Sequence, residues 1–397
     1  MKYGVNPLGN GRSIYANIDQ GGPEISMTNT IVENDLLRKL KDLSIAGLAK
    51  MFDSERQLFC YRVQKSKAGI LMDGHSMRYT MISLLGLHRI EMQGEILPFN
   101  IQDQLDTLLK RAPSIDNIGD VGLLLWLYAQ AKPSMIPQIL YDLNLPSLLE
   151  RHADAQQGKT TELAWFLSGL SYIAQAPIPT PPGIQDLTMK VYEMIRSNYG
   201  NKGIFGHQAT NTFKGKLRGR IGSFADQVYS IYGFSKFGKI YDNKEALNIA
   251  AECGQTICQH QGILGQWWWH YDADTGNVIG KYPVYSVHQH GMAPMALFAL
   301  AQATGTNLDS HINKGLKWII GNNELGINMV DSKENVIWRS FYRKKYRMRF
   351  EELSALIGYS NSNKNNRDLT VLYESRPYCL GWLLYAYAHK IKQGENH

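Results

Sequence analysis

Apolar residues recur at helical spacing along almost the whole chain after residue 35, and convincing two-residue alternation typical of strands is absent. The pattern predicts an all-α chain with one continuous domain over residues 35–397. The first 34 residues are rich in glycine, asparagine, serine and proline, so we expect an irregular arm there. The expected helices cover residues 36–52, 74–90, 100–112, 118–131, 134–155, 160–176, 183–200, 223–241, 243–262, 285–305, 308–323 and 378–392.

Two kinds of helix alternate along this pattern. One kind is amphipathic, as in residues 37–52 and 246–259, and presents a charged face to solvent. The other kind is apolar nearly all round and rich in small residues, as in residues 120–131, 162–176 and 378–388. A helix that is apolar on every side must be buried among other helices. The alternation therefore predicts six outer–inner hairpins arranged in a ring, with a generic helical bundle or solenoid as the alternative.

This hairpin pattern resembles the (α/α)6 toroids over residues 36–392. That group includes the six-hairpin glycosidases, several polysaccharide lyases and sugar epimerases, and the terpenoid cyclases and protein prenyltransferases share a related toroid. The resemblance is architectural, because the motifs of no single family are clearly present. It implies that the loops leading into the inner helices form an active-site funnel.

Composition and charge narrow the class of protein. The chain is 44% hydrophobic and 19% charged, which excludes a disordered or fibrous protein. A net charge of +7 suits an anionic substrate but is too weak to indicate nucleic acid. No signal peptide or transmembrane segment is visible, and the few cysteines are read as buried thiols in a reduced compartment. We therefore expect a cytoplasmic protein.

Polar or charged residues stand at the start of each inner-type helix, where a ring would gather them at one end. Capping explains some of the acidic ones, but positive charge at a helix amino terminus is unfavourable. We therefore expect several of these residues to line a functional site. They are His75, Arg78, Asp120, Glu162, Asp226, Gln227, His288, Gln289 and Arg376.

The loop over residues 265–291 is rich in aromatic residues. Three consecutive tryptophans cannot all point inward, and exposed aromatic rings stack on sugars or shield a carbocation. The alternative is that two of the tryptophans are core plugs between hairpins. The candidate binding residues in this loop are Trp267, Trp268, Trp269, His270, Tyr271, Tyr282 and Tyr285.

A basic and aromatic segment follows at residues 338–353, with six arginines and lysines before the first acid. Such a run is usually a solvated face, and its interleaved aromatic residues make an anion-binding lid the alternative. Nucleic acid is the less favoured partner, since no matching basic stripe occurs elsewhere. The chain has no phosphate-binding glycine loop, nucleophile elbow or zinc helix, and His288 and His290 lack companion metal ligands, so no metal or cofactor is predicted.

These residues favour a carbohydrate-active enzyme that acts on an acidic saccharide. Glycosidic cleavage needs an acid and a second carboxylate, which Asp120, Glu162 and Asp226 could supply. Lyase or epimerase chemistry needs a base for a carbon-bound proton, for which His288 with Tyr282 or Tyr285 is the candidate. Arg78 or Arg376 would neutralise the substrate carboxylate.

Two alternatives remain open from the sequence. Residues 261–267, QGILGQW, resemble the repeat of triterpene cyclases, and residues 272–275 faintly resemble their acidic motif, which would make the substrate an isoprenoid. The repeat occurs well only once, and the acidic motif lacks its last aspartate. A non-catalytic saccharide-binding protein on the same scaffold is the third hypothesis.

Overall fold

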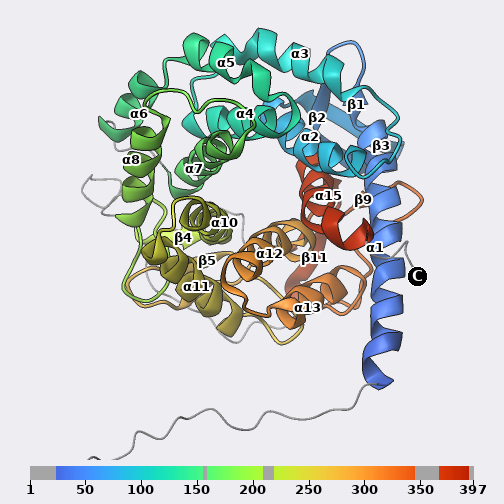
Figure 1. Ribbon diagram of the computed structural model, residues 1–397. Helices are drawn as coiled ribbons and strands as arrows, with labels where there is room; N and C mark the ends of the chain where they lie inside the picture. Colours follow the sequence, from blue (N-terminus) through green and yellow to red (C-terminus); the bar gives the residue numbers. More distant parts are fainter. Residues whose placement is uncertain (1–23, 155–158, 209–218, 345–365, 393–397) are drawn as a thin grey trace, which may run out of the picture.

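Apolar inner helices and amphipathic outer helices alternate around a closed ring (Figure 1). The computed structural model describes residues 24–154, 159–208, 219–344 and 366–392. The inner helices are α2 (Met77–Glu91), α4 (Ile118–Ala131), α7 (Thr160–Gln175), α10 (Phe224–Ile240), α12 (Ala293–Thr304) and α15 (Pro377–Lys392). The outer helices are α1 (Glu24–Lys50), α3 (Ile101–Arg111), α5 (Ile136–Leu143), α6 (Leu145–Asp154), α8 (Ile184–Arg196), α11 (Lys244–Gln259) and α13 (Asp309–Ile319).

Each inner helix packs against the next, and α15 packs against α2 to close the ring. The small residues in these helices permit the close approach. A Cβ atom added at Gly86 of α2 would lie 2.2 Å from the carbonyl oxygen of Gly381 in α15. Gly122 of α4 approaches the backbone of Phe166 in α7 in the same way. The predicted (α/α)6 toroid is confirmed.

Most predicted helices are present, and the differences have local causes. The expected helix 134–155 is two helices, because Asn144 between them adopts a left-handed conformation with φ of 42°. Helix α1 begins at Glu24 instead of residue 36, so the predicted arm is too long, and residues 1–23 of that arm lie outside the described residues. The expected helix 285–305 begins as a π-helical turn, His288–Met292, which precedes α12.

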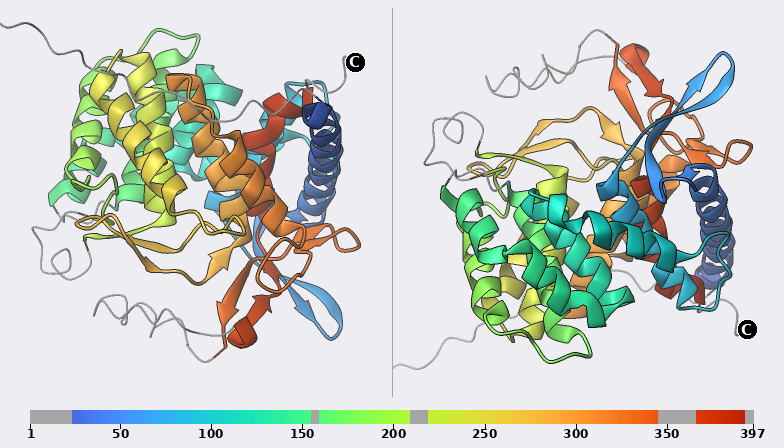
Figure 2. Two further views of the ribbon diagram at one scale, coloured as in Figure 1. Left: turned by 90° about the horizontal axis from the view of Figure 1, so that it is seen from below. Right: turned by 90° about the horizontal axis from the view of Figure 1, so that it is seen from above.

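Short antiparallel strands gather at one end of the ring, a feature that the sequence pattern missed (Figure 2). Strand β3 has almost no buried residue, so the hairpin it forms with β2 lacks the alternation that marks a half-buried strand. The strands form four small sheets. They are β1 (Phe52–Asp53), β2 (Leu58–Ser66), β3 (Gly69–His75) and β12 (Glu374–Ser375); β7 (Val284–Tyr285), β10 (Ser340–Arg343) and β11 (Leu369–Leu372); β4 (Ile221–Ser223), β5 (His270–Asp272) and β6 (Val278–Gly280); and β8 (Val330–Asp331) with β9 (Val336–Ile337).

The strands matter for function because four of them lead directly into inner helices. Strands β3, β4 and β12 precede α2, α10 and α15, and β7 precedes the π-helical turn before α12. The strand-bearing end is therefore the end at which the inner helices begin. This is the end where the toroid resemblance places an active-site funnel.

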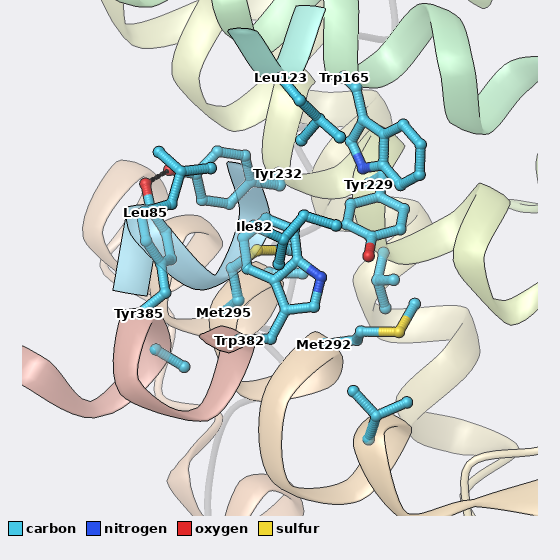
Figure 3. Packing of buried hydrophobic residues seen from close by; sticks show 14 of the residues in the cluster. Ile82, Leu85, Leu123, Trp165, Tyr229, Tyr232, Met292, Met295, Trp382 and Tyr385 are labelled. Carbon is cyan, nitrogen blue, oxygen red and sulfur yellow. Dashed lines mark hydrogen bonds between the residues drawn. The ribbon is translucent and has the colours of Figure 1, made fainter. Parts of the chain in front are cut away.

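Packed side chains fill the centre of the ring, so it is not an open channel (Figure 3). Trp126 and Trp382 are fully buried with ring centres 5.6 Å apart, and Ile82, Tyr229 and Met295 lie around Trp382. A separate cavity lies at each end of this plug, one near the helix starts and one near the helix ends. All four cysteines are buried free thiols. Within the described ranges, no helix has the length and apolar character needed to span a membrane.

Candidate active site

A cavity of about 190 Å³ lies at the end of the ring where the inner helices begin. Four of the six inner helices, α2, α7, α10 and α15, contribute to its wall together with the π-helical turn. The predicted site residues that line it are Arg78, Trp269, Tyr285 and His288. Its other walls are mostly aromatic and apolar, and come from Tyr79, Ile82, Thr161, Trp165, Ala225, Tyr229, Met292, Arg339 and Tyr378.

Asp120 and Glu162 stand beside the cavity and are joined by one polar network. Arg78, which lines the cavity, donates to Asp120 through Nε and to Asn117 through Nη2, at 3.2 Å in the second case. Asn117 in turn donates its amide Nδ2 to Glu162 Oε1 at 3.2 Å. The guanidinium of Arg78 also lies 5.3 Å from the ring centre of Trp165. Two predicted carboxylates and a predicted arginine are thus brought together at one edge of the cavity.

Glu162 is 9% exposed and lies between two cavity residues, Thr161 and Trp165, along α7. Its other charged neighbour is Lys159, whose Nζ lies 3.8 Å from Oε1. Asp120 is in direct contact with the Arg78 guanidinium. Burial lowers the pKa of Arg78, but its hydrogen bond to Asp120 and the charges of both acids outweigh burial and raise that pKa. Arg78 therefore keeps a positive charge between the two carboxylates.

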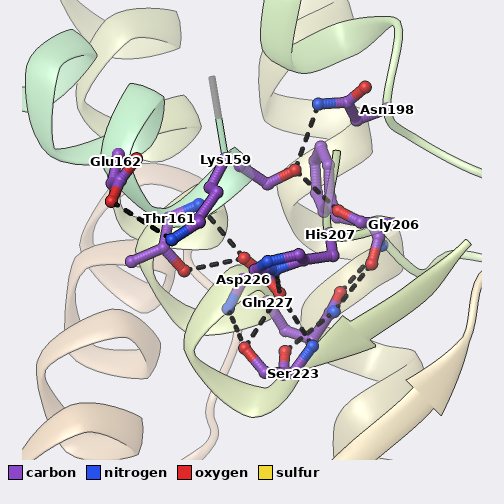
Figure 4. A network of polar contacts seen from close by, with 11 residues as sticks. Lys159, Thr161, Glu162, Asn198, Gly206, His207, Ser223, Asp226 and Gln227 are labelled. Carbon is purple, nitrogen blue, oxygen red and sulfur yellow. Dashed lines mark hydrogen bonds and ion pairs between the residues drawn. The ribbon is translucent and has the colours of Figure 1, made fainter. Parts of the chain in front are cut away.

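Asp226 is bonded to the cavity residue Thr161 but belongs to a saturated network (Figure 4). It is 0% exposed and forms a capping box with Ser223 at the start of α10. Its carboxylate accepts from the backbone and hydroxyl groups of both Thr161 and Ser223, and Oδ2 lies 3.1 Å from His207 Nδ1. Burial raises the pKa of Asp226, but His207 and these hydrogen bonds lower it by more than burial raises it. The pKa is therefore below its ordinary value. This geometry leaves no lone pair directed at a substrate.

Several other predicted residues hold the fold together instead of facing the cavity. Gln227 bonds both backbone groups of Phe205, and Gln289 joins Tyr285 O to the Trp267 backbone. His75, at the end of the exposed β3, lies 2.8 Å from Asp53. These side chains satisfy backbone or ionic partners close to the site without lining it.

The aromatic loop divides in the way that the core-plug alternative describes. Trp269 and Tyr285 line the cavity. Trp267 is fully buried against Phe224, and Trp268 donates Nε1 to the carbonyl of His260 at 2.8 Å. Four residues of the loop are buried and do not line the cavity, namely Trp267, Trp268, His270 and Tyr271. Tyr282 donates its hydroxyl to Glu324 Oε1 at 2.9 Å.

His288 is a buried, neutral base in the cavity wall. Burial, together with the positive charge of Arg339, lowers its pKa from 6.5 to about 3. Its ring stacks on Trp269 with centres 5.9 Å apart. Its Nδ1 has no hydrogen-bond partner within the part of the chain that the structure describes. A neutral imidazole with an unused nitrogen can accept a hydrogen bond or a proton.

Three arginines surround a single carboxylate beside the cavity. Glu374, only 4% exposed, is contacted by Arg62 at 3.1 Å, Arg376 at 2.6 Å and Arg339 at 3.4 Å. Arg376 also donates to the hydroxyl of Tyr79, a cavity residue, at 2.7 Å. Arg339 lines the cavity directly, and its buried Nη1 has no partner among the described residues. The excess positive charge and the unpartnered Nη1 favour an anionic group in this part of the cavity.

No family model matches the chain, and no curated protein matches it by sequence. Among solved structures, an unsaturated glucuronyl hydrolase specific for heparin superposes with a TM-score of 0.59 at 12% identity, covering 91% of this chain and 98% of the other. A possible GH105-family member from Salmonella enterica gives a TM-score of 0.56 at 11% identity, with 91% and 94% covered. The chain has the toroid fold of the six-hairpin glycosidases. A further unsaturated glucuronyl hydrolase variant is described with a saccharide that begins in dGlcA. It superposes with a TM-score of 0.54 at 13% identity, covering 93% of this chain and 97% of the other.

The sequence analysis missed several cavity residues of this glycosidase fold, although a simple spacing signal marks them. On four inner elements, a cavity residue at the helix start is followed four positions later by a second one, on the same helix face. Arg78 and His288 were predicted without their successors, and both members of the other two pairs were missed. The pairs are Arg78 with Ile82, Thr161 with Trp165, Ala225 with Tyr229, and His288 with Met292.

Arg339 was within the basic segment 338–353 but was not singled out. Strand β10 begins one residue later, and the pairing of β10 with β7 holds Arg339 beside Tyr285. Arg343 stacks over Tyr282, with its guanidinium carbon 4.8 Å from the ring centre. Residues 345–353 of the predicted anion-binding lid lie outside the described residues.

Two buried histidines of the π-helical turn give the first prediction, on pH and stability. Burial lowers the pKa of both His288 and His290 to about 3, whereas the unfolded chain has its ordinary value of 6.5. Below pH 6.5 the unfolded state therefore binds more protons than the folded state, and stability falls. Each histidine should remove up to about 1.4 kcal/mol per pH unit in this range.

Denaturant unfolding of the wild type and of His290→Leu at pH 7, 6 and 5 measures this effect. The free energy of unfolding of the wild type should fall more steeply with acid than that of the variant, which loses one of the two titrating groups. Parallel slopes for the two proteins would contradict the prediction.

Proposed function

We propose that the chain is a glycoside hydrolase that cleaves an acidic oligosaccharide in this cavity. The observation that carries the proposal is the placement of two linked carboxylates and a buried arginine, whose Nη1 has no described partner, beside one aromatic-walled cavity. Glycosidic cleavage needs a paired acid and carboxylate, and an acidic sugar needs a cation. The similarity to unsaturated glucuronyl hydrolases supports the same substrate class.

Glu162 and Asp120 take different roles because their partners differ. Asp120 is held by the guanidinium of Arg78, so we assign it the ionised carboxylate that acts as base or nucleophile. Glu162 accepts from the neutral amide of Asn117 and lies farther from a cation, so we assign it the acid that protonates the leaving oxygen. Such a division of roles between two acids is what glycosidic cleavage requires.

The rest of the cavity suits a sugar ring with a carboxylate. Trp165, Trp269 and Tyr229 offer flat aromatic faces on which a sugar can stack. Arg339 Nη1 would donate to the carboxylate, and Arg376 would add to the local positive charge through its contact with Tyr79. The carboxylate and the scissile bond would then lie on different sides of the same cavity.

Proton abstraction from carbon, as in a lyase or epimerase, is the second candidate. One observation favours it, the unpartnered Nδ1 of His288 in the cavity wall, while the lowered pKa of His288 makes this imidazole a weak base. In this case His288 would take the proton and Arg339 would stabilise the carboxylate as it gains charge. A lyase product carries a new carbon–carbon double bond, which distinguishes it from a hydrolysis product.

An isoprenoid substrate is less favoured by the geometry. Gln261 bonds Gly265 and the backbone of His311, so the cyclase-like segment 261–267 joins α11 to α13. Asp272 accepts from the backbone of Asp274 and lies 3.8 Å from Arg220, as part of a turn. Neither aspartate lines the cavity.

A substrate screen tests the proposed function. The protein is incubated with saturated and unsaturated uronic-acid oligosaccharides, their neutral counterparts and prenyl diphosphates, and products are read by mass spectrometry and ultraviolet absorbance. Hydrolysis of an acidic oligosaccharide is the expected result. A new double bond without added water would favour the lyase, and turnover of a prenyl substrate alone would contradict the sugar proposal.

The second prediction concerns recognition of the sugar carboxylate. Arg339→Met should weaken binding of an acidic oligosaccharide by about 10-fold or more, because a charge-assisted hydrogen bond contributes about 1.5–3 kcal/mol. Binding of the matched neutral oligosaccharide should change much less. Calorimetric titration of both ligands measures the difference, with the exposed Arg56→Met as the control variant. Equal losses for the two ligands would assign Arg339 to packing instead of charge recognition.

A further inference from the structure

A second cavity, of about 400 Å³, lies at the opposite end of the ring, where the inner helices end. Two buried tryptophans lie between it and the candidate active site: Trp382 contacts Trp126 and the first-cavity residue Tyr229, and Trp126 contacts Tyr385 of the second cavity. Its wall has two distinct sides. Arg89, Lys236, Tyr232 and Tyr385 form a polar side, and Met295 and Phe298 belong to an apolar one.

The polar side contains two cations and no carboxylate among the described lining residues. Arg89 donates to the carbonyl of Tyr385 at 3.0 Å and to the hydroxyls of Tyr385 and Tyr172 at 2.6 and 3.3 Å. These bonds use three of the five guanidinium N–H groups. Lys236 lies over the rings of Tyr172 and Tyr232 at 5.7 and 5.8 Å. Arg89 therefore contacts hydroxyls and a carbonyl, Lys236 contacts aromatic rings, and neither forms an ion pair within the described ranges.

Three tyrosine hydroxyls meet beside these cations. The oxygens of Tyr172, Tyr232 and Tyr385 lie 2.6–3.0 Å from one another, and Trp126 Nε1 donates to Tyr385. Burial raises the pKa of Tyr172, but the charges of Arg89 and Lys236 outweigh burial and lower this pKa from 10 to about 8. The positive charge in this cavity is thus strong enough to stabilise even a phenolate.

We propose that this second cavity binds an organic anion, whose carboxylate or phosphate group contacts Arg89 and Lys236 and whose apolar body packs on Met295 and Phe298. The two uncompensated cations supply the attraction for the charged group. The apolar wall and the size of the cavity leave room for a ligand with an apolar part in addition to its charged group. Lys390 lies over the ring of Phe298, and its Nζ is 3.8 Å from Asp309 Oδ1, which offsets its charge.

Calorimetric titration with benzoate, phenyl phosphate and benzyl alcohol tests the proposal on the full chain. At least one of the two anions should bind 10-fold or more tightly than the neutral alcohol, and the stronger one identifies the preferred head group. If helix-end carbonyls and phenolate alone balance the two cations, neither anion will bind. That result, or equal binding of the alcohol, would overturn the proposal.

Matched variants locate the binding. Lys236→Met keeps the apolar stem and should weaken anion binding by about 10-fold or more. Lys239→Met removes a charge from the exposed side of the same helix and should leave binding unchanged. Because the cavity lies at the other end of the ring, activity on sugars is measured separately, and failure of one proposal leaves the other standing. Equal effects of the two lysine variants would contradict the assignment.

Tyr172 provides a second, spectroscopic readout. Its ionisation should appear in the ultraviolet spectrum near pH 8 and disappear in Tyr172→Phe. An anion bound beside the hydroxyl cluster opposes the phenolate, so a saturating anion should shift this transition to higher pH. An unchanged transition under saturating anion would place the anion elsewhere.

Discussion

Glu162→Gln is expected to reduce turnover of an acidic oligosaccharide by about 10²-fold or more, within the usual range for general acid–base catalysis. The amide keeps the shape of the side chain but has no acidic proton to give to the leaving oxygen. Asp120→Asn should cause a similar loss, because the amide carries no negative charge to serve as base or nucleophile. Steady-state kinetics of both variants on the best substrate of the screen measures the effect.

The rescue pattern separates these two roles. A substrate with a leaving group that needs no protonation should be turned over by Glu162→Gln nearly as well as by the wild type, but not by Asp120→Asn. Circular dichroism and thermal unfolding show whether each variant is folded. Wild-type turnover in either variant would remove that carboxylate from the mechanism.

Asp226→Asn is expected to destabilise the fold by about 3–5 kcal/mol, the usual cost of breaking a buried, paired charge. The replacement amide would direct N–H groups at donors, because all partners of Asp226 in Figure 4 are donors or the His207 ring. Denaturant unfolding at neutral pH measures the loss. Asp274→Asn, at an exposed position in the turn after β5, is the control and should change stability little.

The pH dependence gives Asp226 an independent signature. Its pKa in the folded state is lower than the ordinary value of 3.8, so the unfolded state binds a proton more readily. Its stabilising contribution is therefore complete above pH 3.8 and is lost as the pH falls below it. The Asn variant should lack this part of the acid sensitivity. A variant of wild-type stability but low activity would restore Asp226 to the catalytic group.

The hydrophobic pattern was sufficient to predict the ring, because helices apolar on all sides can be buried only among other helices. Helix starts also carried real information, since Arg78 and His288 do line the cavity. The sequence could not show which of these polar residues would use their hydrogen-bonding groups on partners within the protein. Asp226 and Gln227 follow the same pattern as Glu162, yet their partners come from Phe205 and His207, on a different segment.

The hydrophobic pattern could not predict the strands or the second cavity, for a related reason. Strand β3 is exposed on both faces, so no hydrophobic alternation marks it. Arg89 and Lys236 each occur in an otherwise ordinary inner helix, more than 140 residues apart, and only the closure of the ring places them together. Convergence of this kind depends on tertiary structure and not on local spacing.

The closure of α15 on α2 has a consequence for the order of events during synthesis. Gly86 and Gly381 touch across 295 positions of sequence (381 minus 86), so the ring cannot close before α15 has been synthesised. That helix also brings Tyr378 to the first cavity and Tyr385 to the second. A nascent chain that lacks α15 exposes the apolar flanks of its neighbours and has neither cavity complete. Neither site can therefore be complete until α15 has packed against α2 and α12.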